Sequence, residues 1–485
     1  GSIKRLDGET SVCVKVTNAG SCAGKEVVQM YVEPPQGKLG KPSRNLAAFA
    51  KTKCLQPGES QELVLKVTDY YISSYDDSGA AGFKSCYVLE NGSYGIYVGT
   101  DVRGAEAAGS FYIPETIATS VCTEAAGPVR QFKRMRAKEG GALAWEEAPL
   151  RTHKMQERIH KEILPDITYT GNKGFTLGEV FDRDISLNEF LAQLSEEDLC
   201  CIVRGEGMCS PKVTPGTAAA FGGVTESLQK LGIPCGCCAD GPSGIRMDCG
   251  TPAFSMPNGT CLACTFDTEL SEELYEMEGA ELRKNRIDTL LGPGINIHRN
   301  PLNGRNFEYF SEDPYLTGIM ASAQLKGMAR FGVTGTIKHF AANNQEYHRR
   351  LLDSVMSERA LREIYLRGFE IAVKEGKAYS IMTTYGAING LWTASNYDLL
   401  TTILRKEWGF EGMVMTDWWA DLNDEGGQPS TDNLAAMVRS QNDVYMVTQD
   451  SLNNKDNLME SLKNGTLKRG ALLRCAGNIC RMLMR

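Results

Sequence analysis

The sequence predicts two folded domains, a small antiparallel β-sandwich followed by an α/β barrel. Its 485 residues are too many for one ordinary hydrophobic core, so more than one domain is expected. The first hundred residues alternate apolar and polar side chains between turn signals. From Leu187 onward, helical patterns alternate instead with short apolar runs. This second pattern is typical of a parallel sheet covered by helices.

The alternating pattern is clearest in the segments expected to form the sandwich. Val12, Val14 and Val16 alternate with polar neighbours, as in a strand with one buried face. Further strands are expected at residues 27–32, 62–67 and 94–98, with Asn18-Ala19-Gly20, Pro57-Gly58 and Asn91-Gly92 as breaks. We therefore place the sandwich at residues 1–103 and a linker region at 104–186, which contains one helix near 153–163.

The barrel is expected over residues 187–485. Its candidate strands are Thr289–Leu291, Gly335–Ile337, Ser380–Thr383 and Met413–Met415. Between them a helix should run from Ser357, its N-cap, to Lys374, and a last helix should run from Leu467 to Met484. Polar residues follow each candidate strand. Because the carboxyl ends of parallel barrel strands share one mouth, these residues should gather there.

The segment Gly412–Trp419 says most about function. A short apolar run, suited to a strand buried on both faces, ends in Asp417 and is followed by Trp418 and Trp419. Asp417 should therefore point into the mouth of the barrel, beside aromatic rings that can stack on a pyranose. This arrangement predicts a site that acts on a sugar.

Composition narrows the choice of partner. The formal charge of −8 argues against nucleic acid or an anionic membrane, and a neutral substrate fits it well. No apolar stretch approaches the ~18 residues of a membrane span. The sixteen cysteines include crowded runs such as Cys235-Gly236-Cys237-Cys238, which suit reduced thiols and favour the cytoplasm. With five histidines and no regular ligand spacing, we expect no metal site and no other cofactor.

Several motifs, in one order, resemble those of family 3 glycoside hydrolases, in particular their β-glucosidases. The matching strings are Asp240-Gly241-Pro242-Ser243-Gly244-Ile245-Arg246, Leu291-Gly292-Pro293, Gly304-Arg305-Asn306-Phe307-Glu308, Ser311-Glu312-Asp313-Pro314, Lys338-His339-Phe340, Ser357-Glu358-Arg359 and Thr416-Asp417-Trp418. The N-terminal part resembles the fibronectin-III-like domain of these enzymes through Val27-Val28-Gln29-Met30-Tyr31-Val32 and Tyr94-Gly95-Ile96-Tyr97-Val98-Gly99. The resemblance implies a fibronectin-III-like sandwich followed by a TIM-like barrel.

The resemblance also implies a retaining β-glucosidase with Asp417 as the nucleophile. In such an enzyme one carboxylate attacks the anomeric carbon, and an acid about 5 to 5.5 Å away protonates the leaving oxygen. A nucleophile must stay ionised, so we expect Arg305, Lys338 and His339 to lower the pKa of Asp417. The alternative is an aspartate that only caps the next helix.

Further residues are implied to bind the sugar. They are Asp240, Arg246, Arg305, Lys338, His339, Met382, Tyr385 and Trp418. Asp240 should accept hydrogen bonds from vicinal hydroxyls, and Arg246 should either hold Asp240 or contact the sugar. Simple turn, surface or core roles remain open for these residues. Thr384 and Gly386 depart from the usual Ser and Asn around Tyr385, and Gly386 removes a hydrogen bond that would position this tyrosine.

The domain order resembles a permuted subgroup in which an α/β sandwich precedes the fibronectin-like domain. The family's general acid/base Glu usually comes from that sandwich, which this sequence lacks, so we name no acid. We expect it on another chain or on a removed segment. The expected partners are a β-glucoside substrate and glucose as product, and a homo-oligomer stays open.

Three rival functions were weighed. A β-N-acetylhexosaminidase would carry an Asp-His dyad in a Gly-rich stretch after Lys338-His339, and that dyad is not visible. A non-catalytic sugar-binding or regulatory subunit is open, because a barrel without its acid can still bind glucose. A β-xylosidase of the same family is also open.

Overall fold

The computed structural model describes residues 2–485, which divide into two compact units. Unit 1 comprises the chain up to Arg151 together with Ala263–Asp267 and Met356–Ile364. Unit 2 comprises Thr152–Leu262, Thr268–Val355 and Tyr365–Arg485. Each unit is described by itself.

Unit 1 is built from antiparallel sheets. Its strands are β1 (Ser2–Leu6), β2 (Glu9–Thr17), β3 (Val27–Glu33), β4 (Asn45–Lys51), β5 (Ser60–Thr68), β6 (Ser74–Asp76), β7 (Cys86–Leu89), β8 (Gly92–Gly99), β9 (Glu106–Ile113), β10 (Ile117–Val121), β11 (Lys133–Ala137) and β12 (Leu143–Glu147). A three-stranded sheet, β1-β2-β5, and a four-stranded sheet, β4-β3-β8-β9, share one hydrophobic core that includes Val12, Met30, Leu65 and Ile96. The predicted sandwich is confirmed, because its expected strands lie within β2, β3, β5 and β8.

The span predicted as a linker, residues 104–186, carries regular structure of its own. β9 pairs with β8 at the edge of the sandwich sheet, and β10 pairs with β7. β11 and β12 form a separate hairpin. The division between the units falls after Arg151. The boundaries drawn from the sequence, at 103 and 186, stay predictions.

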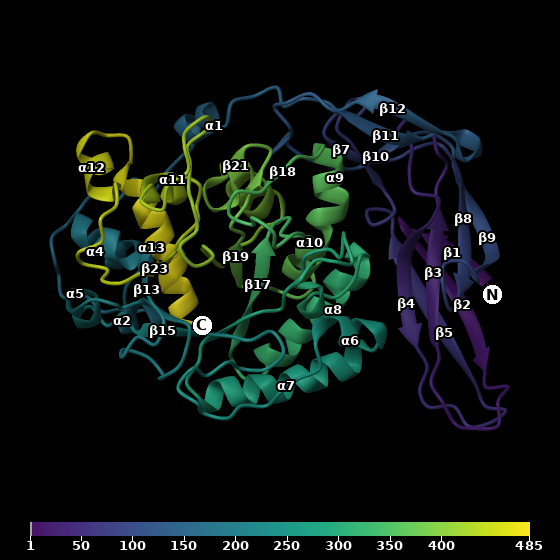
Figure 1. Ribbon diagram of the computed structural model, residues 1–485, viewed down its shortest axis with the longest axis horizontal. Helices are drawn as coiled ribbons and strands as arrows, with labels where there is room; N and C mark the ends of the chain where they lie inside the picture. Colours follow the sequence, from purple (N-terminus) through teal and green to yellow (C-terminus); the bar gives the residue numbers. More distant parts are fainter. Residues whose placement is uncertain (1) are drawn as a thin grey trace. The chain divides into compact units, whose positions relative to one another are not determined.

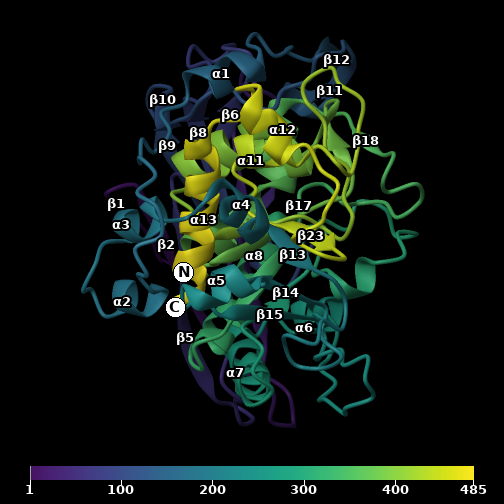
Figure 2. The ribbon, with the colours of Figure 1, turned by 90° about the vertical axis from the view of Figure 1, so that its left-hand side faces the viewer.

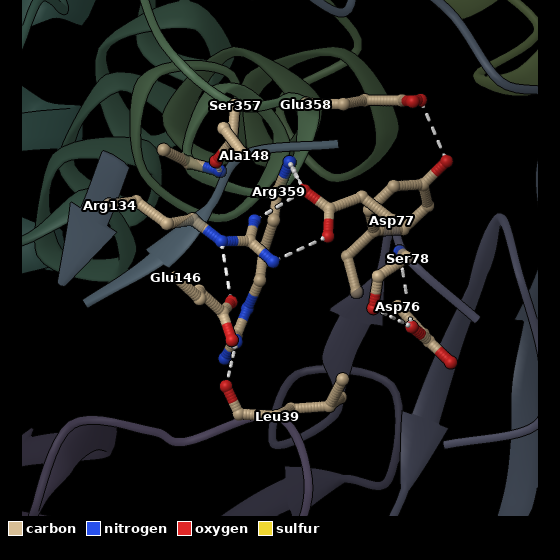
Figure 3. Close-up of polar contacts among 12 residues, drawn as sticks. Leu39, Asp76, Asp77, Ser78, Arg134, Glu146, Ala148, Ser357, Glu358 and Arg359 are labelled. Carbon is tan, nitrogen blue, oxygen red and sulfur yellow. Dashed lines mark hydrogen bonds and ion pairs between the residues drawn. The ribbon is translucent and has the colours of Figure 1, made fainter. Parts of the chain in front are cut away.

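Buried polar contacts anchor the late segment Met356–Ile364 in unit 1 (Figure 3). Arg134 donates from Nη1 and Nη2 to Asp77, at 2.6 and 3.0 Å, and the backbone N–H of Arg359 donates to the same carboxylate at 3.3 Å. Tyr75 donates to Glu358 Oε1 at 2.7 Å. Removing one partner of a buried ion pair costs about 3–5 kcal/mol, so Asp77→Ala should loosen this segment strongly.

Unit 2 contains an eight-stranded sheet in the order β22-β19-β17-β16-β15-β14-β13-β23. The strands are β13 (Arg204–Glu206), β14 (Ala219–Gly222), β15 (Cys235–Asp240), β16 (Thr289–Leu291), β17 (Thr334–Phe340), β19 (Ser380–Thr383), β22 (Met413–Met415) and β23 (Tyr445–Thr448). A parallel bridge between Met415 and Val444 joins the two ends of the sheet. The predicted barrel and its candidate strands are thereby confirmed. Only β14 departs from a fully parallel sheet, since it runs antiparallel to both neighbours.

Helices cover the outside of this sheet (Figures 1 and 2). They are α1 (Met155–Lys161), α2 (Leu177–Phe181), α3 (Leu187–Ala192), α4 (Glu196–Ile202), α5 (Glu226–Lys230), α6 (Gly259–Cys264), α7 (Thr268–Lys284), α8 (Pro314–Ala329), α10 (Arg367–Lys374), α11 (Leu434–Arg439), α12 (Leu458–Lys463) and α13 (Arg469–Leu483), with shorter turns η2 (Asn306–Glu308), η4 (Thr393–Ser395) and the π-helical η5 (Asp398–Glu407). α8 and α10 pack on β17, whereas α13 packs on β14 and β22. Two short antiparallel strands, β20 (Ala387–Ile388) and β21 (Leu391–Trp392), lie beside β18 (Asp353–Ser354).

The helix predicted from Ser357 to Lys374 forms as three consecutive pieces. They are α9 (Glu358–Ala360), the π-helical η3 (Leu361–Tyr365) and α10. Ser357 is the N-cap as predicted, because its hydroxyl accepts a hydrogen bond from the N–H of Ala360 at 3.2 Å. The helix predicted at Leu467–Met484 is α13.

Other sequence expectations concern cysteines, metals and membranes. None of the sixteen cysteines, all of which lie within the described residues, forms a disulfide. Within residues 2–485, no group of His, Cys, Asp and Glu side chains is arranged to hold a metal ion. In the same span, no helix has the length and apolar character needed to cross a bilayer.

Candidate active site

A cavity of about 310 Å³ lies in unit 2 where the strands β15, β17, β19 and β22 end. Its lining residues are Met208, Gly216, Ala218, Asp240, Arg246, Asp248, Leu291, Arg305, Lys338, His339, Arg349, Met382, Tyr385, Asp417, Trp418 and Trp419. Every site residue predicted from the sequence is among them. These predicted residues come from five strands or the loops that follow them, β15, β16, β17, β19 and β22, so the barrel sheet brings them together.

Asp417 lies two residues beyond the end of β22 and is 7% exposed. The N–H of Trp418 donates to its Oδ1 at 2.8 Å, and the hydroxyl of Tyr385 hydrogen-bonds to the carboxylate. His339 Nε2 lies 3.9 Å from Oδ2. The carboxylate is therefore held by neutral donors and lacks a direct ion pair with a lysine or arginine among the described residues.

Burial raises the pKa of Asp417, although the hydrogen bond from Trp418 and the charges of Lys338, Arg305 and Arg349 oppose this shift. The expectation that nearby cations would lower this pKa is therefore wrong in its net direction. The physical reason is that strand β22 is fully buried and the next residue, Trp418, is only 8% exposed, so Asp417 has lost most of its hydration.

Asp240 is the last residue of β15 and faces Lys338 on β17. Lys338 Nζ donates to Asp240 Oδ1 at 2.8 Å. Burial alone would raise the pKa of Asp240, but the charge and hydrogen bond of Lys338 hold it below its usual value. The chain then turns at Gly241, where φ is 120° and a Cβ would lie 1.9 Å from Gly244 O, so only glycine fits.

His339 is buried beside these carboxylates. Its backbone N–H donates to Asn296 Oδ1 at 2.8 Å, and its Nδ1 lies 3.1 Å from the hydroxyl of Tyr309. Burial lowers the pKa of His339 well below its usual value, and the charges of Arg305, Lys338 and Arg349 add to this effect. A neutral imidazole can donate or accept a hydrogen bond, which suits contact with a sugar hydroxyl.

The two arginines named from the sequence have acidic partners. Arg305 Nε donates to Glu308, and its Nη1 lies 3.9 Å from Glu346. Arg246 Nε donates to Asp248 Oδ1 at 2.8 Å, so its guanidinium pairs with Asp248 and not with Asp240 as one alternative proposed. Only the backbone N–H of Arg246 reaches Asp240, at its carbonyl oxygen.

Sequence reasoning missed part of the cavity wall. Arg349 lies in the loop after β17, and its Nη1 donates to Glu346 at 2.9 Å. Met208 and Trp419 are 44% and 46% exposed at the cavity. The loop that carries Arg349 has no periodic pattern, so nothing in the sequence indicated its role. Trp419 was expected beside Asp417 as a ring that can stack on a sugar, but it was not among the residues implied to bind the sugar.

Comparison with known proteins identifies the family. Residues 188–481 match the glycosyl hydrolase family 3 N terminal domain, and residues 26–102 match a fibronectin type III-like domain. The chain is 55% identical to a β-glucosidase of Ruminococcus albus, over 99% of this chain and 51% of the relative.

Solved structures agree with this result. A β-glucosidase from Paenibacillus barengoltzii superimposes with a TM-score of 0.97 at 55% identity, over 100% of this chain and 54% of that one. The β-glucosidase 3B of Thermotoga neapolitana, solved with glucose, gives a TM-score of 0.55 at 41% identity, over 61% of this chain and 42% of its own. The chain thus spans about half the length of these first two relatives. With a matching family domain over most of its length, the chain belongs to glycosyl hydrolase family 3.

Proposed function

We propose that this chain is the nucleophile-bearing part of a retaining β-glucosidase, which removes terminal β-D-glucosyl residues from β-glucosides and short gluco-oligosaccharides. The observation that carries the proposal is one cavity that presents two carboxylates of different kinds. Asp417 is buried and has no direct ion pair with a lysine or arginine among the described residues, whereas Asp240 forms an ion pair with Lys338. Relatives named as β-glucosidases support the same substrate class.

In the proposed reaction Asp417 attacks the anomeric carbon and forms a covalent glucosyl intermediate, while the glycosidic bond breaks and the general acid protonates the leaving oxygen. The hydrogen bonds that the carboxylate of Asp417 accepts are consistent with this role. The Trp418 N–H and the Tyr385 hydroxyl orient the carboxylate without neutralising its charge, so a lone pair remains available for attack. Water then hydrolyses the intermediate with net retention of configuration.

Sugar binding is assigned to other residues that line the cavity. Asp240 accepts hydrogen bonds from vicinal hydroxyls, while Lys338, His339 and Arg305 act as further polar contacts. Trp418 stacks on the apolar face of the ring, and Met382 lies beside it. Arg246, which is exposed and paired with Asp248, contacts the sugar only from the rim.

The general acid is assigned to a segment outside this chain. An acid must hold a proton at working pH, and the ion pair with Lys338 keeps Asp240 ionised. We therefore retain the hypothesis that a Glu from an α/β-sandwich domain, on another chain or on a removed segment, completes the site. The mechanism needs no metal or organic cofactor, and the free thiols favour a cytoplasmic location.

The test is covalent labelling with a 2-deoxy-2-fluoro-β-glucoside that carries an activated leaving group. Such a leaving group departs without acid assistance, so labelling reports on the nucleophile alone. Intact mass and peptide mapping should find one glucosyl adduct on Asp417 and none in Asp417→Asn. An unlabelled chain that still binds glucose would instead support a sugar-binding subunit. Faster labelling by the matching xyloside would favour a β-xylosidase.

A further inference from the structure

The ring of Tyr385 lies close to two arginines from one loop of unit 2. The guanidinium carbons of Arg349 and Arg350 lie 4.5 and 5.1 Å from the ring centroid. Planar guanidinium groups at this distance are attracted to an aromatic ring and restrict its motion. Tyr385 is thus held from outside the sheet as well as by β19.

The two arginines differ in their other contacts. Arg349 lines the cavity and donates to Glu346 at 2.9 Å. Arg350 instead donates from Nη2 to the backbone carbonyl of Trp418 at 3.4 Å. Tyr385 and Trp418 both hydrogen-bond to the carboxylate of Asp417. One guanidinium, that of Arg350, therefore contacts both residues that orient this carboxylate.

The backbone of this loop is fixed against Gly386, directly after Tyr385. The N–H of Ala387 donates to Leu352 O at 2.8 Å, and β18 pairs with β20 just beyond. A Cβ on Gly386 would lie 2.9 Å from Leu352 O and 3.2 Å from Arg349 O. Any larger residue at this position would push residues 349–352 away from the tyrosine.

The backbone carbonyl of Arg350 has a further anchor. Trp392 Nε1 donates to this oxygen at 3.3 Å. Trp392 belongs to β21, which pairs with β20 next to Gly386. Hydrogen bonds thus connect residues 349–352 with the small sheet of β18, β20 and β21, close to Gly386. These connected segments lie next to Tyr385.

We propose that Arg350 is a positioning residue for Tyr385 and Trp418, and that Gly386 is required because it lets the loop 349–352 approach closely enough for this contact. Gly386 removes one hydrogen bond expected for Tyr385, and the arginine contact takes over its positioning role. The inference rests on the proposed function, in which Asp417 is the nucleophile.

The experiment compares Arg350→Met, Arg350→Lys and Gly386→Asn with the unchanged chain. The readouts are the rate of Asp417 labelling by the activated 2-fluoro-β-glucoside and the Kd for glucose. Because misplacement of about 1 Å is enough to slow chemistry by up to about a hundredfold, Arg350→Met and Gly386→Asn should label roughly tenfold more slowly, with a glucose Kd within about twofold. Arg350→Lys should recover part of the rate, since lysine also interacts with an aromatic face.

A matched control is Arg330→Met, which removes an exposed arginine paired with Glu272 and Glu276 outside the cavity. It should label at the unchanged rate. Labelling of Arg350→Met within about twofold of the unchanged chain would overturn the inference, because a guanidinium that positions the site must matter for attack.

Crystal structures separate this inference from the proposed function. In Arg350→Met the Tyr385 hydroxyl should move away from Asp417 by more than the ~0.5 Å tolerance of a preorganised site. An unmoved Tyr385 overturns the inference even if the labelling rate falls. If the unchanged chain is never labelled, the proposed function fails, yet the position of Tyr385 in the variant still decides whether Arg350 holds it.

Discussion

Two of the three aspartates that line the cavity, Asp240 and Asp417, have different surroundings. Asp240 has a lysine at 2.8 Å and a side chain that is 38% exposed, and its pKa is lowered. The Nε2 atom of the neutral His339 lies 3.9 Å from the carboxylate of Asp417. Burial raises the pKa of Asp417. The contrast shows that an ion pair keeps a carboxylate ionised, whereas burial beside neutral donors favours its protonated form.

The difference follows from where each residue leaves its strand. Asp240 ends β15 and so lies within reach of Lys338, which β17 contributes from the same edge of the sheet. Asp417 lies beyond β22, where the N–H of Trp418 and the hydroxyl of Tyr385 contact its carboxylate. The charges of Lys338, Arg305 and Arg349 act on it without an ion pair among the described residues. Strand position and the following aromatic residues thus set the two electrostatic environments.

Asp417→Asn should have the largest effect on the reaction. We expect hydrolysis and labelling to fall by at least about a thousandfold, because the amide cannot form the glucosyl intermediate. Glucose affinity should change little, since Asp240 and Lys338 are the residues proposed to bind the hydroxyls. Mass spectrometry and calorimetry measure the two effects. Turnover retained in this variant would remove Asp417 from the nucleophile role.

Lys338→Met should convert Asp240 into a carboxylate that is partly buried and unpaired. Loss of a charge-assisted hydrogen bond of about 1.5–3 kcal/mol predicts glucose binding weaker by about 10- to 100-fold. The pKa of Asp240 should then rise, since burial is no longer opposed by Lys338. Calorimetry at several pH values should show affinity falling as the pH is lowered. Affinity equal to that of the unchanged chain would mean that the pair does not contact sugar.

Much of this cavity could be predicted from the sequence. Short apolar runs that end in polar residues located β16, β19 and β22 to the residue, and family motifs named residues that line one cavity. The antiparallel orientation of β14 relative to its neighbours could not be predicted, because a short apolar run does not show whether a strand is parallel or antiparallel to the next one.

Other features depend on contacts between distant segments. The net pKa direction of Asp417 was wrong because the sequence shows which cations are near but not how completely the carboxylate is buried. The partner of Arg246 was ambiguous, since Asp240 and Asp248 are both close in sequence. Arg350 gave no signal, because its loop reaches Tyr385 only through the approach to Gly386.

The pH dependence of labelling tests whether the pKa of Asp417 is raised. As the proposed nucleophile, Asp417 must be ionised to attack. The labelling rate should therefore rise with pH and reach half its plateau above the usual aspartate pKa of about 3.9. A raised folded-state pKa also means that the native protein binds this proton more tightly than the unfolded chain does. Its contribution to stability is therefore present at low pH and is lost as the pH rises through the folded pKa.

Thermal unfolding tests the sign of this linkage. Compared with Asp417→Asn, the unchanged chain should gain Tm as the pH is lowered from 7 through the folded pKa, because protonation removes the cost of a buried charge. The prediction is contradicted if the Tm difference between the two chains is constant with pH and the pH midpoint of labelling lies at or below the usual aspartate pKa. Asp417 would then have a pKa that is not raised, as Asp240 does.

The smallest expected effect concerns the third carboxylate of the cavity, Asp248, which pairs with Arg246 at 2.8 Å on the rim. The side chains are 30% and 58% exposed, so the pair is of the surface kind, worth about 0–1 kcal/mol. Asp248→Asn should therefore change glucose affinity by less than about fivefold and leave the labelling rate constant unaltered. Titration and labelling on the same sample measure both. If Asp248→Asn lost as much glucose affinity as Lys338→Met, Arg246 would depend on Asp248 to reach the sugar. The Arg246–Asp248 pair would then contribute to binding as much as the Asp240–Lys338 pair.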